Sequence, residues 1–246
     1  MKIHIISEIG SNWEGDIELG KIHIKKSKEC GAHFVKFQMW RANDLYDESH
    51  PHWIEIKKSE LTEAAAKELK KYADKIGIKW FCSVFYPEAV DILESLDVPF
   101  YKIASRTATL KDNFSLETIR KVGTTNKLTF VSTGEGADKE KIKKQFPNIN
   151  PQFTYCVAKY PTPDADINWN ELLNFDFFSD HTLEITIPLV YCSLKNFTSN
   201  NDIYIEKHVK LDNNKGPDSS FAISYNKLAD MVYHVQRIEK LVTRHI

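Results

Sequence analysis

The sequence predicts an α/β protein that folds as a single (β/α)8 TIM barrel. Short runs rich in β-branched and aromatic residues alternate with longer amphipathic runs, which is the pattern of repeated βα units. A unit of helix, glycine and strand recurs three times along the chain. The length of 246 residues is also close to the roughly 250 that such a barrel needs.

Strand candidates alternate with helices along the whole chain. Eight are expected, at residues 3–7, 33–38, 79–84, 99–103, 127–132, 152–157, 175–179 and 203–206. Helices over residues 16–30, 64–76 and 117–122 are followed by Gly31, Gly77 and Gly123, because glycine can end a helix in the left-handed conformation. A last helix is expected over residues 224–241. Since no stretch rich in Pro, Gly or Ser divides the chain, residues 1–246 are expected to form one domain.

Composition and charge exclude several classes of function. The 33 Lys and Arg residues nearly balance the 34 Asp and Glu residues, so we expect neither a nucleic acid nor a membrane partner. The N-terminus has no pattern typical of export or anchoring. Cys30, Cys82, Cys156 and Cys192 have no paired spacing, which favours a reduced, cytoplasmic compartment, and Cys82 and Cys156 are expected inside strands as small apolar groups. The basic run at residues 139–144 is interpreted as a solvated helix face.

Reactive side chains stand at the ends of the predicted strands, where barrel enzymes carry their active sites. They are Glu8, Lys36, Gln38, Ser83, Lys102, Ser105, Ser132, Tyr160, Ser179, Asp180, His181, Glu206 and His208. Because side chains alternate along a strand, Lys36 and Gln38 share one side, which we expect to face the interior of the ring.

Lys36 and Lys102 bring two ammonium groups into the predicted interior. A buried lysine must pair with an anion or lose its proton. Each lysine could pair with a nearby Asp or Glu, or burial could lower its pKa and make it a candidate for a Schiff base. For the two lysines together we favour a site that holds a phosphate or carboxylate, with hydrogen bonds from Ser83, Ser105, Ser132 and Ser179.

His181 and His208 end neighbouring predicted strands, so their imidazoles could converge on one metal ion. Two histidines are fewer than a closed structural zinc site needs, and water, a carboxylate or substrate would complete the shell. The alternative is that both are ordinary surface or core histidines. Asp180 and Glu206 are either supporting groups or simply carboxylates at strand ends.

Eight short blocks occur in a fixed order at or near these strand ends. They are EIGSN at 8–12, FVKFQ at 34–38, YKIAS at 101–105, STG at 132–134, YPTP at 160–163, FSDHT at 178–182, EKH at 206–208 and GPD at 216–218. Together they resemble the catalytic barrel of the sialic acid synthase family, and the resemblance covers nearly the whole chain.

The resemblance implies a condensation of phosphoenolpyruvate with the aldehyde of an N-acetylmannosamine-like sugar, which gives a nonulosonic acid for a surface polysaccharide. It also implies a divalent metal, usually Mn²⁺, with Mg²⁺ or Co²⁺ as alternatives. By position, His181 and His208 would bind the metal. Phosphoenolpyruvate would be held by Lys36, Ser83, Lys102, Ser105, Ser132 and Ser179. Glu8, Gln38, Tyr160 and Asp218 would face the acceptor or the reacting carbons, with Glu8 as the carboxylate that stabilises positive charge at C2.

Three positions depart from the family pattern, and we expect all three to affect the acceptor side. Trp13 stands where the family has His, Thr107 where it usually has a Glu that binds sugar hydroxyls, and Ala158 where it has a small polar residue. The resemblance also implies a C-terminal antifreeze-like domain that reaches over the site of the partner subunit in a homodimer, and residues 1–246 are expected to form the barrel alone. A separate capping partner, an acceptor that needs no cap, a longer natural chain or a loss of condensation would each be consistent with this, and a homodimer is the other partner expected.

Two other functions fit the same pattern. A metal-dependent sugar isomerase or epimerase could use the two histidines with Glu8, because one fold supports many reactions. A barrel that binds phosphoenolpyruvate without turnover would keep the anion site alone.

Overall fold

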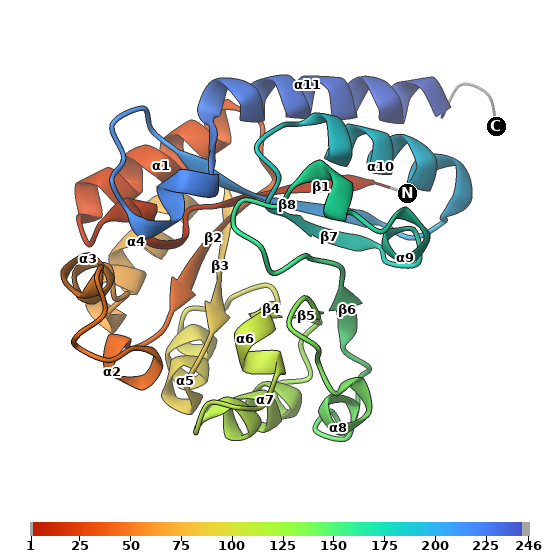
Figure 1. Ribbon diagram of the computed structural model, residues 1–246. Coiled ribbons are helices and arrows are strands. Elements are labelled where there is room, and N and C mark those ends of the chain that lie inside the picture. The colour runs from red at the N-terminus through yellow and green to blue at the C-terminus, as the bar shows by residue number, and fades with distance from the viewer. Residues whose placement is uncertain (1, 243–246) are drawn as a thin grey trace.

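The computed structural model describes residues 2–242 and has a ring of parallel strands inside a layer of helices (Figure 1). The strands are β1 (Ile3–Glu8), β2 (Phe34–Met39), β3 (Lys79–Val84), β4 (Tyr101–Ile103), β5 (Thr129–Ser132), β6 (Gln152–Thr154), β7 (Phe177–Asp180) and β8 (Ile203–Lys210). They pair in the order β6-β5-β4-β3-β2-β1-β8-β7. Tyr155 closes the ring, because its N–H donates to Phe177 O at 3.0 Å and its carbonyl accepts from Ser179 N at 2.9 Å. The predicted barrel is confirmed.

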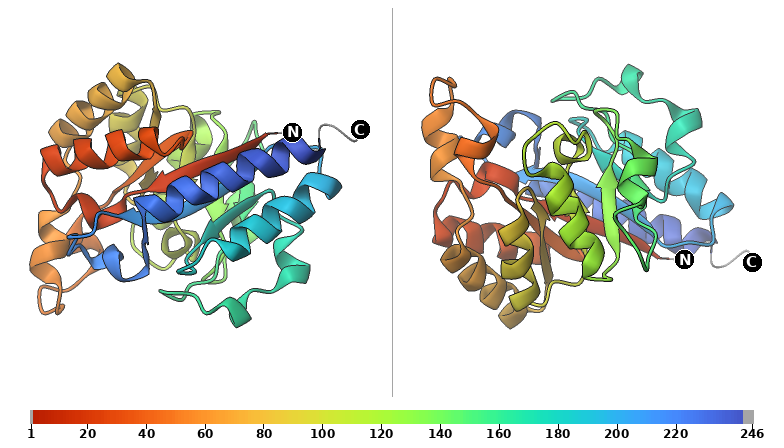
Figure 2. Two further views of the ribbon diagram at one scale, coloured as in Figure 1. Left: turned by 90° about the horizontal axis from the view of Figure 1, so that it is seen from above. Right: turned by 90° about the horizontal axis from the view of Figure 1, so that it is seen from below.

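Helices cover the outside of the sheet, and α10 and α11 lie side by side over β8 (Figure 2). The helices are α1 (Ile17–Glu29), α2 (Ala42–Leu45), α3 (Trp53–Lys58), α4 (Glu63–Ile76), α5 (Pro87–Ser95), α6 (Ser105–Ala108), α7 (Ser115–Thr124), α8 (Lys139–Lys143), α9 (Trp169–Leu172), α10 (Thr186–Thr198) and α11 (Tyr225–Val242). Short 3₁₀ turns are η1 (Gly10–Trp13), η2 (Asp164–Asp166) and η3 (Pro217–Phe221). None of the helices described between residues 2 and 242 has the length and apolar character to cross a membrane.

Two stacked layers of side chains fill the interior of the barrel. The lower layer is aromatic, with ring centroids 4.4 to 6.3 Å apart, and consists of Phe34, Phe81, Phe100, Phe130, Phe177 and Tyr204. The upper layer is polar and stands two residues later on the same strands, at Lys36, Ser83, Lys102, Ser132, Ser179 and Glu206. Side chains alternate along a strand with a period of two. Each polar residue therefore points to the same interior as the aromatic residue two positions before it, one layer nearer the C-terminal ends of the strands.

Gly123 does not end a helix as the sequence predicted. It lies inside α7, and Asn126 takes the left-handed conformation with φ of 57°. A Cβ on Gly123 would meet Gln145 O at 2.0 Å, so glycine is needed there for the close approach of another segment. Gly31 and Gly77 do have positive φ, of 85° and 74°.

Other element boundaries differ at their ends. Ser224 belongs to a short strand, β9 (Ile223–Ser224), which pairs with β8, so the last helix begins one residue later than expected. Strand β8 runs four residues beyond the expected end and therefore includes His208. Strand β6 ends at Thr154, so Cys156 lies beyond the strand instead of inside it.

Candidate active site

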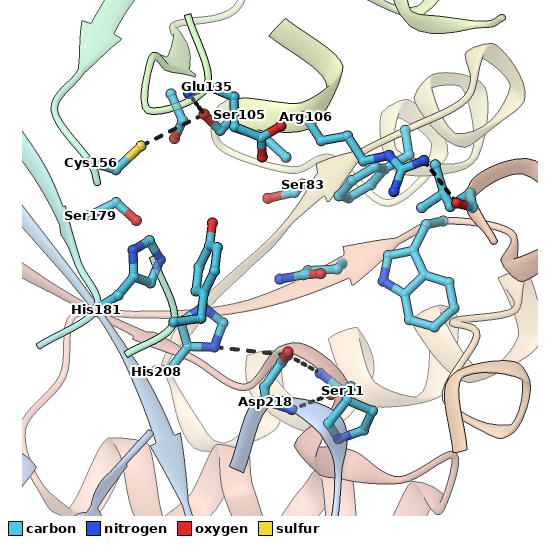
Figure 3. Close-up of a pocket in the computed structure, with 18 of the residues that line it drawn as sticks. Ser11, Ser83, Ser105, Arg106, Glu135, Cys156, Ser179, His181, His208 and Asp218 are labelled. Carbon is cyan, nitrogen blue, oxygen red and sulfur yellow. Dashed lines mark hydrogen bonds and ion pairs between the residues drawn. The ribbon is translucent and has the colours of Figure 1, made fainter. Parts of the chain in front are cut away.

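A cavity of about 560 Å³ opens at the C-terminal ends of the strands (Figure 3). It is lined by all of the predicted catalytic and substrate-binding residues except Glu8: Lys36, Gln38, Ser83, Lys102, Ser105, Ser132, Tyr160, Ser179, His181, His208 and Asp218. Glu8 is fully buried and does not line the cavity, although its register partners Lys36 and His208 do. The two lysines and the two histidines therefore face one common space.

Both interior lysines share one carboxylate, that of Glu206. Lys36 Nζ lies 3.0 Å from Glu206 Oε2, and Lys102 Nζ lies 3.3 Å from Glu206 Oε1. Ser179 Oγ donates to Glu206 Oε1 at 2.7 Å, and Lys36 Nζ donates to Ser83 Oγ at 3.0 Å. Pairing of the lysines with a carboxylate, one of the alternatives from the sequence, is thus present in the structure. Glu206 is a member of the site itself.

The pKa values of Glu206, Lys36 and Lys102 shift in different directions because each side chain faces a different balance of burial and neighbouring charge. Burial alone would raise the pKa of Glu206, but the ammonium groups of Lys102 and Lys36 hold it well below its ordinary value. Burial would likewise lower the pKa of Lys36, yet Glu206 and Glu8 raise it. Burial and the nearby charge of Lys36 lower the pKa of Lys102. The floor thus keeps an ionised carboxylate between two cationic side chains.

Glu8 is connected to the cavity through its neighbours. Gln38 Nε2 donates to Glu8 Oε1 at 2.7 Å, and Lys36 Nζ lies 3.3 Å from Glu8 Oε2. Burial raises the pKa of Glu8 to about 8, and this shift is only partly offset by Lys36. Burial thus favours the protonated form of Glu8, and the ammonium group of Lys36 favours the ionised form.

His181 and His208 approach each other with ring centroids 5.5 Å apart. His181 Nδ1 donates to Val157 O at 3.2 Å, so Nε2 keeps its lone pair. Nδ1 of His208 is buried without a hydrogen-bond partner among the described residues, and Asp218 Oδ2 lies 3.9 Å away, too far for a hydrogen bond. Burial lowers the pKa of His181 to about 4 and, together with His181 and Lys36, lowers the pKa of His208 well below its ordinary value.

Two neutral imidazoles facing one cavity fit a divalent metal ion. A carbonyl hydrogen bond such as that of His181 to Val157 is the usual support for a ligating histidine. Within residues 2–242, no cluster of three or more His, Cys, Asp and Glu side chains could hold a metal. A metal on this pair would therefore leave positions for substrate or water.

The wall opposite the serines is built by η1 and η3. Asp218 Oδ2 accepts from Ser11 N at 2.7 Å, and Asp218 N donates to Ser11 Oγ at 3.1 Å. Gly10 has φ of +55°, and a Cβ there would lie 2.0 Å from Asp218 Oδ2. The glycine of the EIGSN block thus allows Asp218 to approach the cavity.

The turn after β5 is fixed by side chains from two other segments. Glu135 N donates to Ser105 Oγ at 2.8 Å, and Gly134 N donates to Cys156 Sγ at 3.2 Å. Figure 3 shows Glu135, Ser105 and Cys156 together on one wall, with Asp218 on the other. Cys156 is therefore part of the site, where the sequence reasoning treated it as a small apolar group.

The three departures from the family pattern do not line the cavity. Trp13 is buried against Phe37, and its Nε1 donates to Ser59 O at 3.2 Å. Thr107 is 1% exposed on α6, and Ala158 lies between the cavity residues Cys156 and Tyr160. An effect of these three positions on the acceptor side stays a prediction, and it would have to act through the residues that do line the cavity.

The cavity extends further toward α2 and α3 than the sequence predicted. Its additional lining comes mainly from loops and includes Trp40, Tyr46, His50, His52, Arg106 and Asp112. Arg106 donates to both carboxylate oxygens of Asp112 at 2.9 and 3.1 Å and to Leu45 O at 2.8 Å. In the sequence, Arg106 directly follows the predicted site residue Ser105, and this neighbour relation is the signal that could have indicated that Arg106 lines the cavity.

Asp180 and Lys207 point away from the cavity. They pair across β7 and β8, with Lys207 Nζ 2.6 Å from Asp180 Oδ2 and both side chains at most 1% exposed. Lys207 also donates to Thr182. This ion pair joins the outer sides of the two strands that lead to His181 and His208.

Comparisons with known proteins identify the family and agree with the fold. A model described as the NeuB family matches residues 23–246. An uncharacterized protein of Methanocaldococcus jannaschii is 34% identical over 97% of this chain and 71% of its own length. The N,N'-diacetyllegionaminic acid synthase of Campylobacter jejuni is 30% identical over 97% of this chain and 77% of its own length. The solved structure of the N-acetylneuraminic acid synthetase of Leptospira borgpetersenii is similar in fold, with a TM-score of 0.86 at 23% identity, over 100% of this chain and 87% of that one.

Proposed function

Because the chain belongs to the NeuB family, whose members include sialic-acid-type synthases, we propose that it condenses phosphoenolpyruvate with an aldose to give a sugar acid and phosphate. The observation that carries the proposal is that Lys36, Lys102, His181 and His208 all line one cavity. A cationic floor suits the enolpyruvate anion, and a pair of neutral histidines beside it suits the carbonyl end of an acceptor.

The polar layer is the proposed seat of phosphoenolpyruvate. Lys36 and Lys102 supply charge, and the four serines Ser83, Ser105, Ser132 and Ser179 supply directional hydrogen bonds. The lysine to Glu206 distances of 3.0 to 3.4 Å are longer than the roughly 2.7–2.9 Å of strong charge-assisted bonds. The ammonium groups therefore keep capacity for a second anion.

The proposed reaction forms two bonds, C3 to the aldehyde carbon and water oxygen to C2, and breaks the bond between C2 and the phosphate oxygen; one proton of the water ends on the aldehyde oxygen and the other leaves with the phosphate. C3 of the enolpyruvate attacks the aldehyde carbon, water adds at C2, and the C2–O bond to phosphate breaks, with Lys36 and Lys102 holding the departing phosphate. Glu206, held ionised by the two lysines, is better suited than Glu8 to offset positive charge at C2, because Glu206 lines the cavity and Glu8 does not. Glu8 would act on the cavity only indirectly, through its hydrogen bond with Gln38 and its ion pair with Lys36, which both line the cavity.

His181 and His208 would hold a divalent metal, for which we propose Mn²⁺. When bound, the metal would polarise the aldehyde oxygen of the acceptor as a Lewis acid. His181 contributes its Nε2 lone pair, since Nδ1 is engaged by Val157 O.

The test is release of inorganic phosphate from phosphoenolpyruvate with Mn²⁺ and a panel of acceptors: N-acetylmannosamine, other hexosamines, pentoses and short aldehydes. We expect release that requires both the metal and one class of acceptor, with the condensed acid identified by mass spectrometry. Lys102→Met should abolish release. Lys195→Met, which removes a buried lysine outside the cavity, should not.

Two results would contradict the proposal. An isomerase or epimerase would interconvert sugars and leave phosphoenolpyruvate unchanged. A binding protein would be stabilised against heat by phosphoenolpyruvate yet release no phosphate with any member of the panel.

A further inference from the structure

The carboxylates that line the cavity differ in whether they already have partners. Glu206 is held by two lysines and Ser179, Asp112 by Arg106, and Asp218 by Ser11. Glu135 also lines the cavity, but its carboxylate makes no hydrogen bond or ion pair with the described residues 2–242. An unpartnered anion on the wall of a substrate cavity is available for a ligand.

The backbone of Glu135 is fixed although its side chain is exposed. Its N–H donates to Ser105 Oγ at 2.8 Å, the preceding N–H of Gly134 donates to Cys156 Sγ at 3.2 Å, and Gly136 N donates to Thr133 O at 3.1 Å. Thr133 in turn donates to Thr154 O through its N–H at 3.2 Å and its hydroxyl at 3.1 Å. The turn thus presents the side chain from a position set by two neighbouring segments, one at Ser105 and one at Thr154 and Cys156, which lowers the cost of ordering it on a ligand.

The surroundings of Glu135 are polar groups that bind sugars well. Burial, followed by Cys156 and Glu135, raises the pKa of the Tyr160 hydroxyl, and Glu135 adds to the stronger effect of Asp112 in raising the pKa of Arg106. Tyr160 and Arg106 also line the cavity, so a hydroxyl donor and a guanidinium share this space with the Glu135 carboxylate.

Charge decides which substrate this carboxylate serves. Phosphoenolpyruvate is an anion, and a second negative charge beside it is repulsive. The hydroxyl groups of an aldose are neutral donors, and their hydrogen bonds to an ionised acceptor are among the stronger ones that proteins make. Thr107, at the position where the resemblance implies a sugar-binding Glu, is buried and cannot supply this carboxylate.

We propose that Glu135 is a specificity-determining residue that binds hydroxyl groups of the acceptor sugar, from the turn after β5 instead of from position 107. This inference rests on the proposed function and deepens it, because it assigns the Glu135 wall of the cavity to a neutral, polyhydroxylated part of the acceptor.

The test compares wild type with Glu135→Gln, using Mn²⁺, phosphoenolpyruvate and the most active acceptor among N-acetylmannosamine, mannose and arabinose. We expect the KM for the acceptor to rise about 10- to 100-fold, the range of a lost charge-assisted hydrogen bond. The KM for phosphoenolpyruvate should stay unchanged or fall, since a repulsive charge is removed. A variant that only damaged the structure would raise both KM values.

Glu140→Gln is the matched control, because Glu140 lies on the following helix, pairs with Lys143 at 2.9 Å and does not line the cavity. Its kinetics should equal those of wild type. Acceptor analogues that each lack one hydroxyl add a second readout. For the analogue that lacks the bound hydroxyl, KM should be much higher than for the parent acceptor with wild type. With Glu135→Gln, the KM values of the analogue and of the parent acceptor should be similar.

The outcomes separate this inference from the proposed function. Turnover by wild type with the same acceptor KM in Glu135→Gln would overturn the role of Glu135 and leave the proposed function standing. A parallel rise of both KM values would also overturn it. Wild type that releases no phosphate with any acceptor would refute the proposed function, and this inference with it, before any variant is compared.

Discussion

Replacing Lys207 with methionine should destabilise the fold by about 3–5 kcal/mol, the usual cost of removing one partner of a buried ion pair. Lys207 Nζ lies 2.6 Å from Asp180 Oδ2, and neither side chain is more than 1% exposed. The variant therefore leaves a carboxylate buried without its cation. For a chain of this size, each kcal/mol shifts Tm by roughly 2–4 °C, so the expected fall in Tm is about 6–20 °C.

A matched control pair joins Lys195 on α10 to Asp176, the residue directly before β7. Lys195 Nζ lies 2.6 Å from Asp176 Oδ1, but the Asp176 side chain is 28% exposed, so water can replace the lost ammonium. Lys195→Met should therefore cost only about 1 kcal/mol. Urea unfolding followed by circular dichroism measures both variants. Equal losses of unfolding free energy in Lys207→Met and Lys195→Met would refute the argument from burial.

The Lys207 variant should also affect metal binding. The Asp180–Lys207 pair joins β7 and β8 next to His181 and His208, so it helps to set the spacing of the two imidazoles. Loss of such a support commonly weakens metal affinity about 10- to 100-fold. Calorimetric titration with Mn²⁺ at a temperature where Lys207→Met is folded measures this effect, and Mn²⁺ affinity equal to that of Lys195→Met would contradict it.

Four further predictions concern other parts of the molecule. His181→Ala or His208→Ala should abolish phosphate release and Mn²⁺ binding in calorimetry, and full activity of either variant would remove the metal assignment. Burial holds the pKa of His23 at about 4, below its ordinary 6.5, so the unfolded chain binds the extra proton between these values. The stability from neutral His23 should thus be complete above pH 6.5 and fall by about 3 kcal/mol as the pH drops to 4. In urea unfolding, the free energy of unfolding of His23→Gln should fall less between pH 6.5 and pH 4 than that of wild type. An equal fall in the two proteins would contradict the role of His23. Gly123→Ala should lower the unfolding free energy by about 1–3 kcal/mol through its clash, whereas helix propensity alone predicts a gain of about 0.5–1 kcal/mol. Glu206→Gln should lower Tm without ligand and enlarge the Tm rise caused by phosphoenolpyruvate, because the anion then replaces the missing counter-ion. A rise no larger than in wild type would contradict this role.

The sequence predicted the floor of the candidate site well because a strand relates residues by a fixed rule. Once β2 and β8 are identified, the alternation of side chains places Lys36 and Glu206 inside the barrel, and the parallel register brings strand ends to one mouth. The same rule makes the aromatic layer predictable from the sequence, because each residue of the polar layer follows an aromatic residue by two positions.

Residues outside the strands obeyed no such rule. Arg106 reaches the cavity because Asp112 and Leu45, from different segments, hold its guanidinium. Trp13 is directed away from the cavity by its hydrogen bond to Ser59 O. These partners are distant or irregularly spaced in sequence, so neither propensity nor periodicity could assign the direction of the two side chains.

The layered interior also explains where the specificity of such a barrel can vary. The aromatic layer excludes water from below, so charges in the polar layer must be balanced by one another, which is why Lys36 and Lys102 converge on Glu206. A substitution in that layer disturbs both packing and charge balance. Glu135 stands above it, on a turn that contributes no side chain to either layer. The wall that carries Glu135 can therefore change while the floor, which we propose binds the enolpyruvate, stays the same, and the proposed role of Glu135 is a change of this kind.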